Sequence, residues 1–371
     1  MRILLDYRPA LRQRTGVGAY VHETARALVA TAPPDEALVL FSSSWKDRLD
    51  GQAVPGAQIV DRRVPVRLLN LAWHRLGRPA VERLAGAGFD VVQGAHPLLI
   101  PSASAARLVT IYDLDFLDHP ERSRREIRRD YPALTAEHAR RADQVVVIST
   151  HTARAVESRL GVPASHISIC VPGVSVPPAR ETDPPADGCV LFVGTLEPRK
   201  NLGVLLDAYA RLVSRRPDTP RLVLAGRITP DSEPYLRRAS SGVLAGRVEV
   251  PGYVDEATKR ELFRRALVFV LPSHTEGFGL PVVEAMASGV PVIVANRGAL
   301  PEVVGSAGYL VDPANAEELA AALEQLLTDA GMRRRLSEAG RERATRFTWA
   351  STAQAMREAW RQAMLHRSSR S

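Results

Sequence analysis

The chain has 371 residues, which is enough for two or three domains that each bury a hydrophobic core. Its 45% hydrophobic and 24% charged residues are typical of a globular protein, and no apolar run reaches the roughly 18 residues that a membrane-spanning helix needs. The net charge of +8 favours anionic partners. Zinc-finger spacing and aromatic RNA-binding motifs are both missing, so we expect no nucleic-acid partner.

The cysteines and the first residues bear on the cellular compartment. Cys170 and Cys189 lie in apolar segments without metal-ligand spacing, so we expect two core thiols in a reducing environment. Arg2 and Asp6 interrupt the first apolar run, which is unlike a signal peptide. We therefore predict a cytoplasmic protein. The arginine-rich residues 121–141 leave open a peripheral contact with the inner face of an anionic membrane, although their acidic residues also fit a solvated helix.

Short β-branched segments alternate with segments of helical periodicity along the whole chain. We predict strands at 2–5, 38–41, 90–93, 108–111 and 144–148, and again at 189–193, 221–225, 247–250, 267–271 and 291–294. Several are continuously apolar, as in parallel sheets covered on both faces. Apolar residues three and four apart predict helices at 202–213 and 317–327. This alternation predicts an α/β protein with two doubly wound, Rossmann-like domains.

A proline-rich stretch separates the two halves. Residues 172–188 contain five prolines and little apolar material, as expected for a stiff, exposed connector. We assign residues 1–175 to the first domain, 176–188 to a linker and 189–351 to the second domain. A terminal helix within 352–371 carries Met356 and Trp360 on one stripe. Such a stripe must cover an apolar surface, and the helix could cross back to the first domain.

Ligands of open α/β sheets bind at loops that follow the carboxyl ends of strands. Gly16 and Gly18 precede a helix that we expect near Val21, and they lie either beside a bound anion or sugar or in a plain turn. Arg199 and Lys200 come before another helix, where cations oppose the helix dipole. An anion bound between them would offset this cost. We interpret Lys200 as a diphosphate partner, with a solvated loop lysine as the alternative.

Two later loops complete the candidate site. Arg227, Tyr253 and Val254 lie at strand ends and could line a base pocket, although a turn and core packing explain them equally well. The segment from Glu276 to Glu284 follows an apolar strand and contains glycines that leave N–H groups at a helix start. A carboxylate in the first turn of that helix can accept hydrogen bonds from a ribose diol. A solvated helix start is the simpler reading.

Several motifs together resemble the retaining glycosyltransferases of family 4, in particular the mannosyltransferase-like branch used for O-antigen and related polysaccharides. The resemblance covers nearly the whole chain and is most specific in its second half. The motifs that carry it are Gly16-Val17-Gly18-Ala19-Tyr20, Asp113-Leu114, His119-Pro120-Glu121, Gly194-Thr195-Leu196-Glu197-Pro198-Arg199-Lys200-Asn201, Glu276-Gly277-Phe278-Gly279-Leu280-Pro281, Glu284-Ala285-Met286-Ala287-Ser288-Gly289 and Phe347-Thr348-Trp349.

The resemblance implies the GT-B fold, in which two Rossmann-like domains face each other across a cleft. It implies transfer of a hexose from a sugar nucleotide to a saccharide or lipid-linked saccharide acceptor, with no cofactor and no obligatory metal. GDP-mannose is the favoured donor, and UDP- or ADP-glucose-type donors remain open. The rival hypotheses are a GT-B sugar-nucleotide epimerase and a catalytically silent sugar-nucleotide-binding protein.

By position in the family motifs, Glu284 would hold the ribose diol, Lys200 the diphosphate, and Glu276 would face the transferred sugar. The predicted donor-binding residues are Gly16, Gly18, Arg199, Lys200, Arg227, Tyr253, Val254, Glu276, Gly277, Phe278, Gly279, Leu280 and Glu284.

The predicted catalytic candidates are Glu276, Lys200, Tyr112, Asp113 and His96. One departure from the family concerns Tyr112, because related enzymes commonly carry a histidine directly before the aspartate that is Asp113 here. A tyrosine can hydrogen-bond a sugar hydroxyl, but it is not protonated near neutral pH as a histidine can be. His96 lies in a strand-end loop and could take over that role, or it could be a loop-packing histidine.

Overall fold

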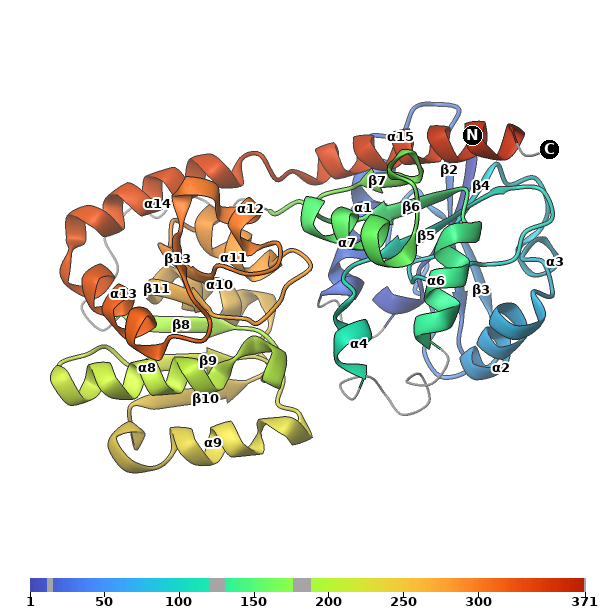
Figure 1. Cartoon of the computed structure of the whole chain (residues 1–371). Helices are drawn as coiled ribbons and strands as arrows, with labels where there is room; N and C mark the ends of the chain where they lie inside the picture. The colour runs from blue at the N-terminus through green and yellow to red at the C-terminus, as the bar shows by residue number, and fades with distance from the viewer. Residues whose placement is uncertain (12–15, 121–130, 176–187, 370–371) are drawn as a thin grey trace. The chain divides into compact units, whose positions relative to one another are not determined.

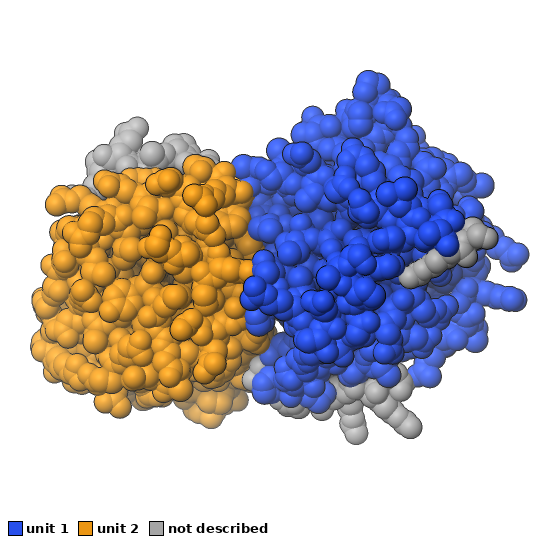
Figure 2. All heavy atoms as spheres, turned by 45° about the horizontal axis from the view of Figure 1, so that its top comes forward, with its two compact units in different colours: residues 1–173, 348–371 blue, residues 174–347 orange. Residues whose placement is uncertain are grey.

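The computed structural model describes residues 1–11, 16–120, 131–175 and 188–369. The chain forms two compact units, one made of Met1–Gly173 with Thr348–Ser371 and the other of Val174–Phe347 (Figures 1 and 2). Each unit is built on a parallel sheet flanked by helices, which confirms the predicted α/β class with two Rossmann-like domains. Residues 176–187 of the predicted linker lie outside the described residues.

The sheet of the first unit has seven parallel strands in the order β3-β2-β1-β4-β5-β6-β7. Its central strands are buried except for Arg2 and Arg107, because helices cover both faces. The strands are β1 (Arg2–Asp6), β2 (Ala37–Ser43), β3 (Gln58–Arg62), β4 (Val91–Gln93), β5 (Ala106–Ile111), β6 (Gln144–Val147) and β7 (Ile167–Ile169). The longer helices are α1 (Val17–Ala30), α6 (Tyr131–Arg141), α7 (Thr150–Leu160) and α15 (Trp349–Ser368), and the short ones are α2 (Val66–Leu71), α3 (Glu82–Ala85) and α4 (Asp115–Asp118).

The sheet of the second unit has six parallel strands in the order β10-β9-β8-β11-β12-β13. The strands are β8 (Cys189–Val193), β9 (Leu222–Ala225), β10 (Val248–Gly252), β11 (Ala266–Leu271), β12 (Val292–Ala295) and β13 (Tyr309–Val311). The helices are α8 (Leu202–Arg215), α9 (Glu233–Ala239), α10 (Glu256–Arg265), α11 (Leu280–Ala287), α12 (Leu300–Val304), α13 (Ala316–Thr328) and α14 (Ala330–Ala344). Within the described residues, no helix is both long enough and apolar enough to cross a membrane.

Every strand predicted from the apolar segments is present, with ends that shift by one or two residues. The sequence did not reveal β3, β7 and β13, which are edge strands with mixed polarity or only three residues. The prediction that a helix begins near Val21 was wrong. Helix α1 begins at Val17, because Gly16 adopts a positive φ of 53° and serves as its N-cap. Gly18 is therefore the second residue of the helix and not part of the preceding loop.

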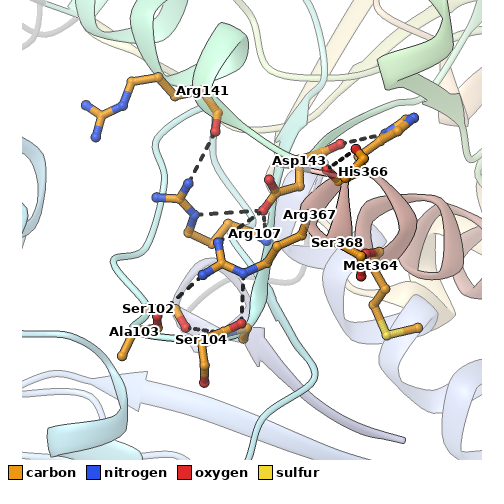
Figure 3. Close-up of polar contacts among 12 residues, drawn as sticks. Ser102, Ala103, Ser104, Arg107, Arg141, Asp143, Met364, His366, Arg367 and Ser368 are labelled. Atoms are coloured by element: carbon orange, nitrogen blue, oxygen red, sulfur yellow. Dashed lines mark hydrogen bonds and ion pairs between the residues drawn. The ribbon is translucent and has the colours of Figure 1, made fainter. Parts of the chain in front are cut away.

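The terminal helix α15 returns to the first unit, as predicted, and lies against α1, β5 and β6 (Figure 1). Its Trp360 is buried and donates a hydrogen bond from Nε1 to Oε1 of Gln93 at 2.7 Å. At its end, Arg367 donates to the carbonyl of Ser104 at 2.8 Å, and His366 lies 3.0 Å from the carbonyl of Asp143 (Figure 3). These contacts fix both the middle and the end of the helix.

A buried ion pair also anchors α15. The Arg357 guanidinium contacts both carboxylate oxygens of Glu36 at 2.8–3.0 Å and donates to the carbonyl of Leu28 at 2.8 Å. Both side chains are nearly inaccessible to solvent. Removing one member of such a pair leaves the other charge buried without a partner, and this is strongly destabilising.

We expect Arg357→Ala to lower the free energy of unfolding of the first unit by about 3–5 kcal/mol, because Glu36 would remain as an uncompensated buried charge. The chain's four tryptophans are Trp45, Trp73, Trp349 and Trp360, and all belong to this unit, so tryptophan fluorescence in urea reports its unfolding selectively. The control is Arg361→Ala on the same helix, which removes an exposed pair with Glu358 and should cost less than about 1 kcal/mol. Equal effects of the two variants would contradict the prediction.

Candidate functional site

The first part of the candidate site is the loop between β8 and α8. Pro198–Lys200 form one turn of 3-10 helix, and Asn201 follows with a φ of 57° in the left-handed region. Asparagine tolerates this conformation better than most residues. The side-chain amide of Asn201 then donates to the carbonyls of Pro272 and Pro313 at 3.0 and 2.7 Å. The turn and Asn201 together bury Lys200 at the carboxyl edge of the sheet.

The second part is the loop after β11, which brings Glu276 against the same cations. Lys200 Nζ lies 2.5 Å from Oε1 of Glu276, and an Nη1 of Arg199 lies 3.1 Å from Oε2. The hydroxyl of Ser273 donates to Oε1 at 2.7 Å. We call Arg199, Lys200, Ser273 and Glu276 the ion cluster. The structure thus brings together three of the predicted site residues from loops more than seventy residues apart.

Backbone contacts hold these loops in register. The amide of His274 donates to the carbonyl of Arg199 at 2.9 Å, and the Arg199 guanidinium donates to the carbonyl of Thr275 at 3.0 Å. On the other side, Gly298 in the loop after β12 approaches Glu276 closely. A Cβ on Gly298 would lie 2.7 Å from the Glu276 nitrogen, so only glycine fits there. Glu276 is therefore fixed by its backbone as well as by its ion pairs.

The electrostatics keep Glu276 ionised despite its burial. Burial by itself raises the pKa of a carboxyl group, but Lys200, Arg199 and the hydroxyl of Ser273 outweigh it and lower the pKa of Glu276 to about 2. A negative charge is therefore present at this position throughout the neutral range. Such a charge can stabilise positive charge on a sugar ring placed beside it.

Glu284 lies on α11 and meets a cation that the sequence analysis did not identify. Lys259 of α10 contacts Oε1 of Glu284 at 2.8 Å and Glu256 at 2.9 Å. Burial raises the pKa of Glu284, and Lys259 offsets part of that rise. The Glu284 side chain remains 27% exposed, so its carboxylate can still accept hydrogen bonds from a ligand in solvent. Lys259 therefore helps to position Glu284 and to hold its charge.

The glycines between the two glutamates shape the start of α11. Gly279 is its N-cap with a φ of 101°, and a Cβ there would lie 2.8 Å from the side chain of Leu300. Gly277 is buried, and Leu280 is the first residue of the helix. The ring of Phe278 packs against Phe347 at 5.6 Å. Phe278 can therefore contribute to a ligand site only through its backbone, near the donors that a helix N-terminus provides.

The remaining predicted residues of the second unit lie along the same edge of the sheet. Arg227 follows β9 and is exposed, while Tyr253 and Val254 follow β10 with an exposed ring and a half-buried side chain. Gly226 touches the β8 loop so closely that a Cβ would lie 1.8 Å from the carbonyl of Gly194. The loops after β8, β9, β10 and β11 therefore form one continuous edge, because these strands are neighbours in the sheet.

In the first unit, Tyr112 occupies a closed environment. Its ring packs edge to face on Tyr20 at 5.6 Å. Its hydroxyl is buried without a hydrogen-bond partner among the described residues. Burial, with a smaller contribution from Asp6, raises the pKa of Tyr112, so the hydroxyl stays protonated and can donate. Asp113 follows it and accepts a hydrogen bond from the amide of Asp115 at 3.2 Å.

His96 lies among charged residues at the carboxyl ends of β1 and β4. Its side chain is open to solvent, yet desolvation by its surroundings lowers the pKa of His96, and Asp6 counteracts this effect. Asp6 is buried and binds Arg8 through both carboxylate oxygens at 2.7 and 2.8 Å. We call Asp6, Arg8, His96 and Tyr112 the first-unit cluster.

Sequence reasoning missed Lys259, Ser273, Asn201 and Gly298. Asn201 ends the motif that contains Lys200, and Ser273 lies three residues before the motif that begins at Glu276, so their closeness in sequence to Lys200 and Glu276 was a usable signal. Lys259 and Gly298 gave no such signal, because their contacts depend on the packing of α10 and on the order of β11 and β12. The described residues contain no group of three His, Cys, Asp or Glu side chains that could hold a metal ion.

Comparison with known families defines the class of protein. Residues 14–176 match the model of the family described as Glycosyltransferase Family 4, and residues 179–343 match that described as Glycosyl transferases group 1. The two matches follow the two units of the structure. The chain is therefore a glycosyltransferase with the two-domain GT-B architecture, assembled from a family 4 domain and a group 1 domain.

Several individual proteins are similar to the chain along nearly its whole length. The chain is 26% identical to the O-antigen chain mannosyltransferase B of Escherichia coli, over 94% of this chain and 96% of that protein. Sucrose-phosphate synthase from Thermosynechococcus elongatus shares the fold with a TM-score of 0.78, 22% identity and 98% coverage of both chains. An Anabaena protein solved in complex with UDP and glucose does so with a TM-score of 0.71 and 18% identity, over 96% of this chain and 98% of that one.

The pH dependence of stability tests the ion cluster. The pKa of Glu276 is lowered from its usual 4.5 to about 2, so its ion pairs stabilise the fold above pH 4.5, and this contribution is lost as the pH falls toward 2. We expect the stability advantage of the wild type over Glu276→Gln to shrink by about 2 kcal/mol between pH 6 and pH 3. Urea unfolding followed by far-UV circular dichroism measures it, since the second unit lacks tryptophan.

The control for this prediction is Glu249→Gln, which replaces an exposed carboxylate in the same unit. Its difference from the wild type should stay nearly constant over the same pH range. A constant difference for Glu276→Gln as well would show that Glu276 is not held by the cations in solution.

Proposed function

We propose that this glycosyltransferase moves a mannosyl residue from GDP-mannose to a hydroxyl group of a saccharide or lipid-linked saccharide, with retention of anomeric configuration and without a metal ion. The ion cluster at the carboxyl edge of the second sheet carries the proposal, because it places two cations and one ionised carboxylate beside a glycine-rich helix start. The choice of mannose is supported by the similarity to a mannosyltransferase along nearly the whole chain.

In this proposal the leaving diphosphate meets Lys200 and the N-terminus of α11. An ammonium group has three donors, so Lys200 can keep its contact with Glu276 and still bind a phosphate oxygen. Preorganised charge of this kind stabilises the negative charge that develops on the leaving group. Both the cation and the helix N-terminus belong to the protein, so the reaction needs no divalent cation to neutralise the diphosphate.

The two glutamates would then act on different parts of the donor. Glu276 is ionised and fixed by its backbone, and it would face the sugar as positive charge develops at the anomeric carbon. Glu284 reaches solvent near the helix start and would accept hydrogen bonds from the ribose hydroxyls. In the first unit, Tyr112 takes the place of the usual histidine, but its hydroxyl is buried, so we assign it no contact with the sugar.

Three alternatives remain for experiment. One alternative is a UDP- or ADP-glucose-type donor, and a fold relative was solved with UDP and glucose. An epimerase would bind the same donor and convert it without an acceptor. A silent binding protein would bind the donor and turn over nothing. These alternatives differ in what they do to the donor, so one set of assays separates them.

We expect GDP-mannose to raise the thermal midpoint more than UDP-glucose or ADP-glucose, because a ligand that binds the native state stabilises it.

We expect GDP to be released, and an α-mannoside formed, when short α-mannosides or prenyl-linked mannosaccharides are added. NMR of the product reads its anomeric configuration. EDTA should leave the rate unchanged within about twofold, since Lys200 and the helix N-terminus supply the charge.

The results that would contradict this proposal are distinct. Conversion of the donor without an acceptor would identify an epimerase. Donor binding with no turnover across the acceptor panel would indicate a silent protein. Loss of activity in EDTA with recovery in manganese or magnesium would overturn metal independence, and an inverted product would overturn retention.

Substitutions of the two glutamates should affect different kinetic parameters. Glu276→Gln should lower kcat by about 100-fold, because a charge that acts mainly in the transition state is lost. Glu284→Gln should raise the donor KM by about tenfold with a smaller effect on kcat, because ribose binding contributes equally to ground and transition states. Steady-state kinetics at saturating acceptor measure both, and Glu233→Gln, an exposed residue of α9, is the control. The reverse pattern would exchange the two assignments.

A further inference from the structure

The exposed apolar side chains of the described residues are not evenly distributed. Five of the ten large hydrophobic residues that are exposed lie between positions 45 and 76, in the first unit. They are Trp45 at 69%, Val66 at 37%, Leu68 at 61%, Leu71 at 58% and Leu76 at 72% exposure. Single exposed apolar residues are normal on protein surfaces, but a group of five in one region marks an interaction surface.

Four of these residues lie on one short helical segment. Helix α2 (Val66–Leu71) follows the edge strand β3 and continues into a π-helical turn, Ala72–Leu76 (Figure 1). Leu69 and Trp73 are four residues apart and buried in the core, so they define the inner side of the segment. Leu68 and Leu71 are three residues apart and share the outer side, facing solvent. Both sides of the segment therefore carry apolar residues, although only the inner side packs against the core.

Trp45 belongs to the same region through the adjoining strands. It follows Ser44, whose amide donates to the carbonyl of Arg62 at 3.2 Å, directly after the pairing of β2 with β3. The hydroxyl of Ser43 donates to the carbonyl of Val64 at 2.8 Å. The loop that carries Trp45 therefore lies beside the start of the α2 segment.

The charge of this segment has one sign. Between Asp61 and Glu82 the chain contains no acidic residue, and it carries five exposed arginines, which are Arg62, Arg63, Arg67, Arg75 and Arg78. In the loop after Trp45, Lys46 and Arg48 are exposed, and so is Asp50, while Asp47 is half-buried. Exposed leucines and tryptophan surrounded by arginines match the interface of an anionic bilayer, where apolar side chains enter the acyl boundary and cations meet the headgroups.

We propose that this surface docks on an anionic lipid membrane. We call it the docking face and define it by Trp45, Val66, Leu68, Leu71 and Leu76 with the five arginines. Charge complementarity selects lipid over a second copy of the chain, because two such faces would repel each other through their arginines. The absence of Asp and Glu between positions 62 and 81 also disfavours an apolar partner surface, which would offer these arginines no acidic groups.

The docking face is connected to the first-unit cluster by the inner side of the same segment. Oδ1 of Asn70 accepts a hydrogen bond from Nη1 of Arg8 at 2.8 Å, and the Arg8 guanidinium lies 5.2 Å from the centre of the Trp73 ring. Arg8 in turn binds Asp6. A lipid-linked acceptor held at the membrane would thus present its saccharide near this cluster. This last step rests on the proposed function, whereas membrane docking itself does not.

Vesicle co-sedimentation tests the docking face with the full chain. The wild type should sediment with vesicles of phosphatidylcholine and phosphatidylglycerol, and much less with phosphatidylcholine alone or at high salt. Replacing Leu68, Leu71 and Leu76 together by serine should lower the partition coefficient at least about tenfold. Arg63→Gln combined with Arg78→Gln should lower it by about 30-fold at low salt.

The matched control carries Val243→Ser and Leu365→Ser, which remove exposed apolar residues outside the docking face. It should bind vesicles as the wild type does. Folding of each variant is checked by its unfolding midpoint, and all residues changed are exposed. Equal vesicle binding by the triple-leucine variant and the control would overturn the proposal. A wild-type protein that does not bind anionic vesicles would also overturn it. If the wild type is a dimer and the triple-leucine variant is a monomer, and both bind vesicles equally, the face would be assigned to contact with a second copy instead.

Turnover of a water-soluble acceptor separates this proposal from the proposed function. The triple-leucine variant should turn over a short soluble mannoside at the wild-type rate and lose rate only on a vesicle-embedded, prenyl-linked acceptor. Loss of both rates would place the three leucines in the catalytic fold and overturn a docking role. Vesicle binding without any transferase activity would leave docking supported while the proposed function fails.

Discussion

The contact between Glu276 and the two cations of the β8 loop determines the geometry of the second unit's ligand edge. A carboxylate, an ammonium and a guanidinium are stable at this depth only if each remains paired, because desolvation of a single charge costs more than any one hydrogen bond returns. The pairing fixes the loops after β8 and β11 relative to each other before any ligand arrives. A donor would therefore find the charges already in position, which is the condition for electrostatic catalysis.

The first unit uses the same kind of buried pairing for two other purposes. Asp6 and Arg8 neutralise each other, and Arg8 also contacts Asn70 and Trp73 on the α2 segment. Arg357 and Glu36 join the terminal helix to the turn that follows α1. The Asp6–Arg8 pair thus connects the first-unit cluster with the docking face, and the Arg357–Glu36 pair makes the terminal helix part of the first unit's core.

The fold and the ligand edge could largely be predicted from residues that act locally. Continuous apolar runs such as Leu267–Leu271 are typical of strands in a parallel sheet that is covered on both faces, and ligands of such sheets bind at the carboxyl ends. The motifs with Lys200 and Glu276 both follow strands of this type, so both were expected at the same edge of the sheet. The glycines after Glu276 also indicated a helix start, and α11 begins at Leu280. Edge strands such as β3 escaped prediction, because half-exposed strands carry mixed polarity.

The sequence by itself determined the period of each element, the positions of the loops and the chemical groups that these loops carry. Only the tertiary structure decided which groups are partners and which are buried. Lys259 of α10 meets Glu284 of α11, and the ring of Tyr112 packs against Tyr20, although these partners lie far apart in the sequence. Leu68 and Leu69 are alike as neighbours in the chain, yet one is exposed and the other is core. The physical reason is that desolvation and ion pairing depend on long-range packing, whereas periodicity and capping depend on near neighbours along the chain.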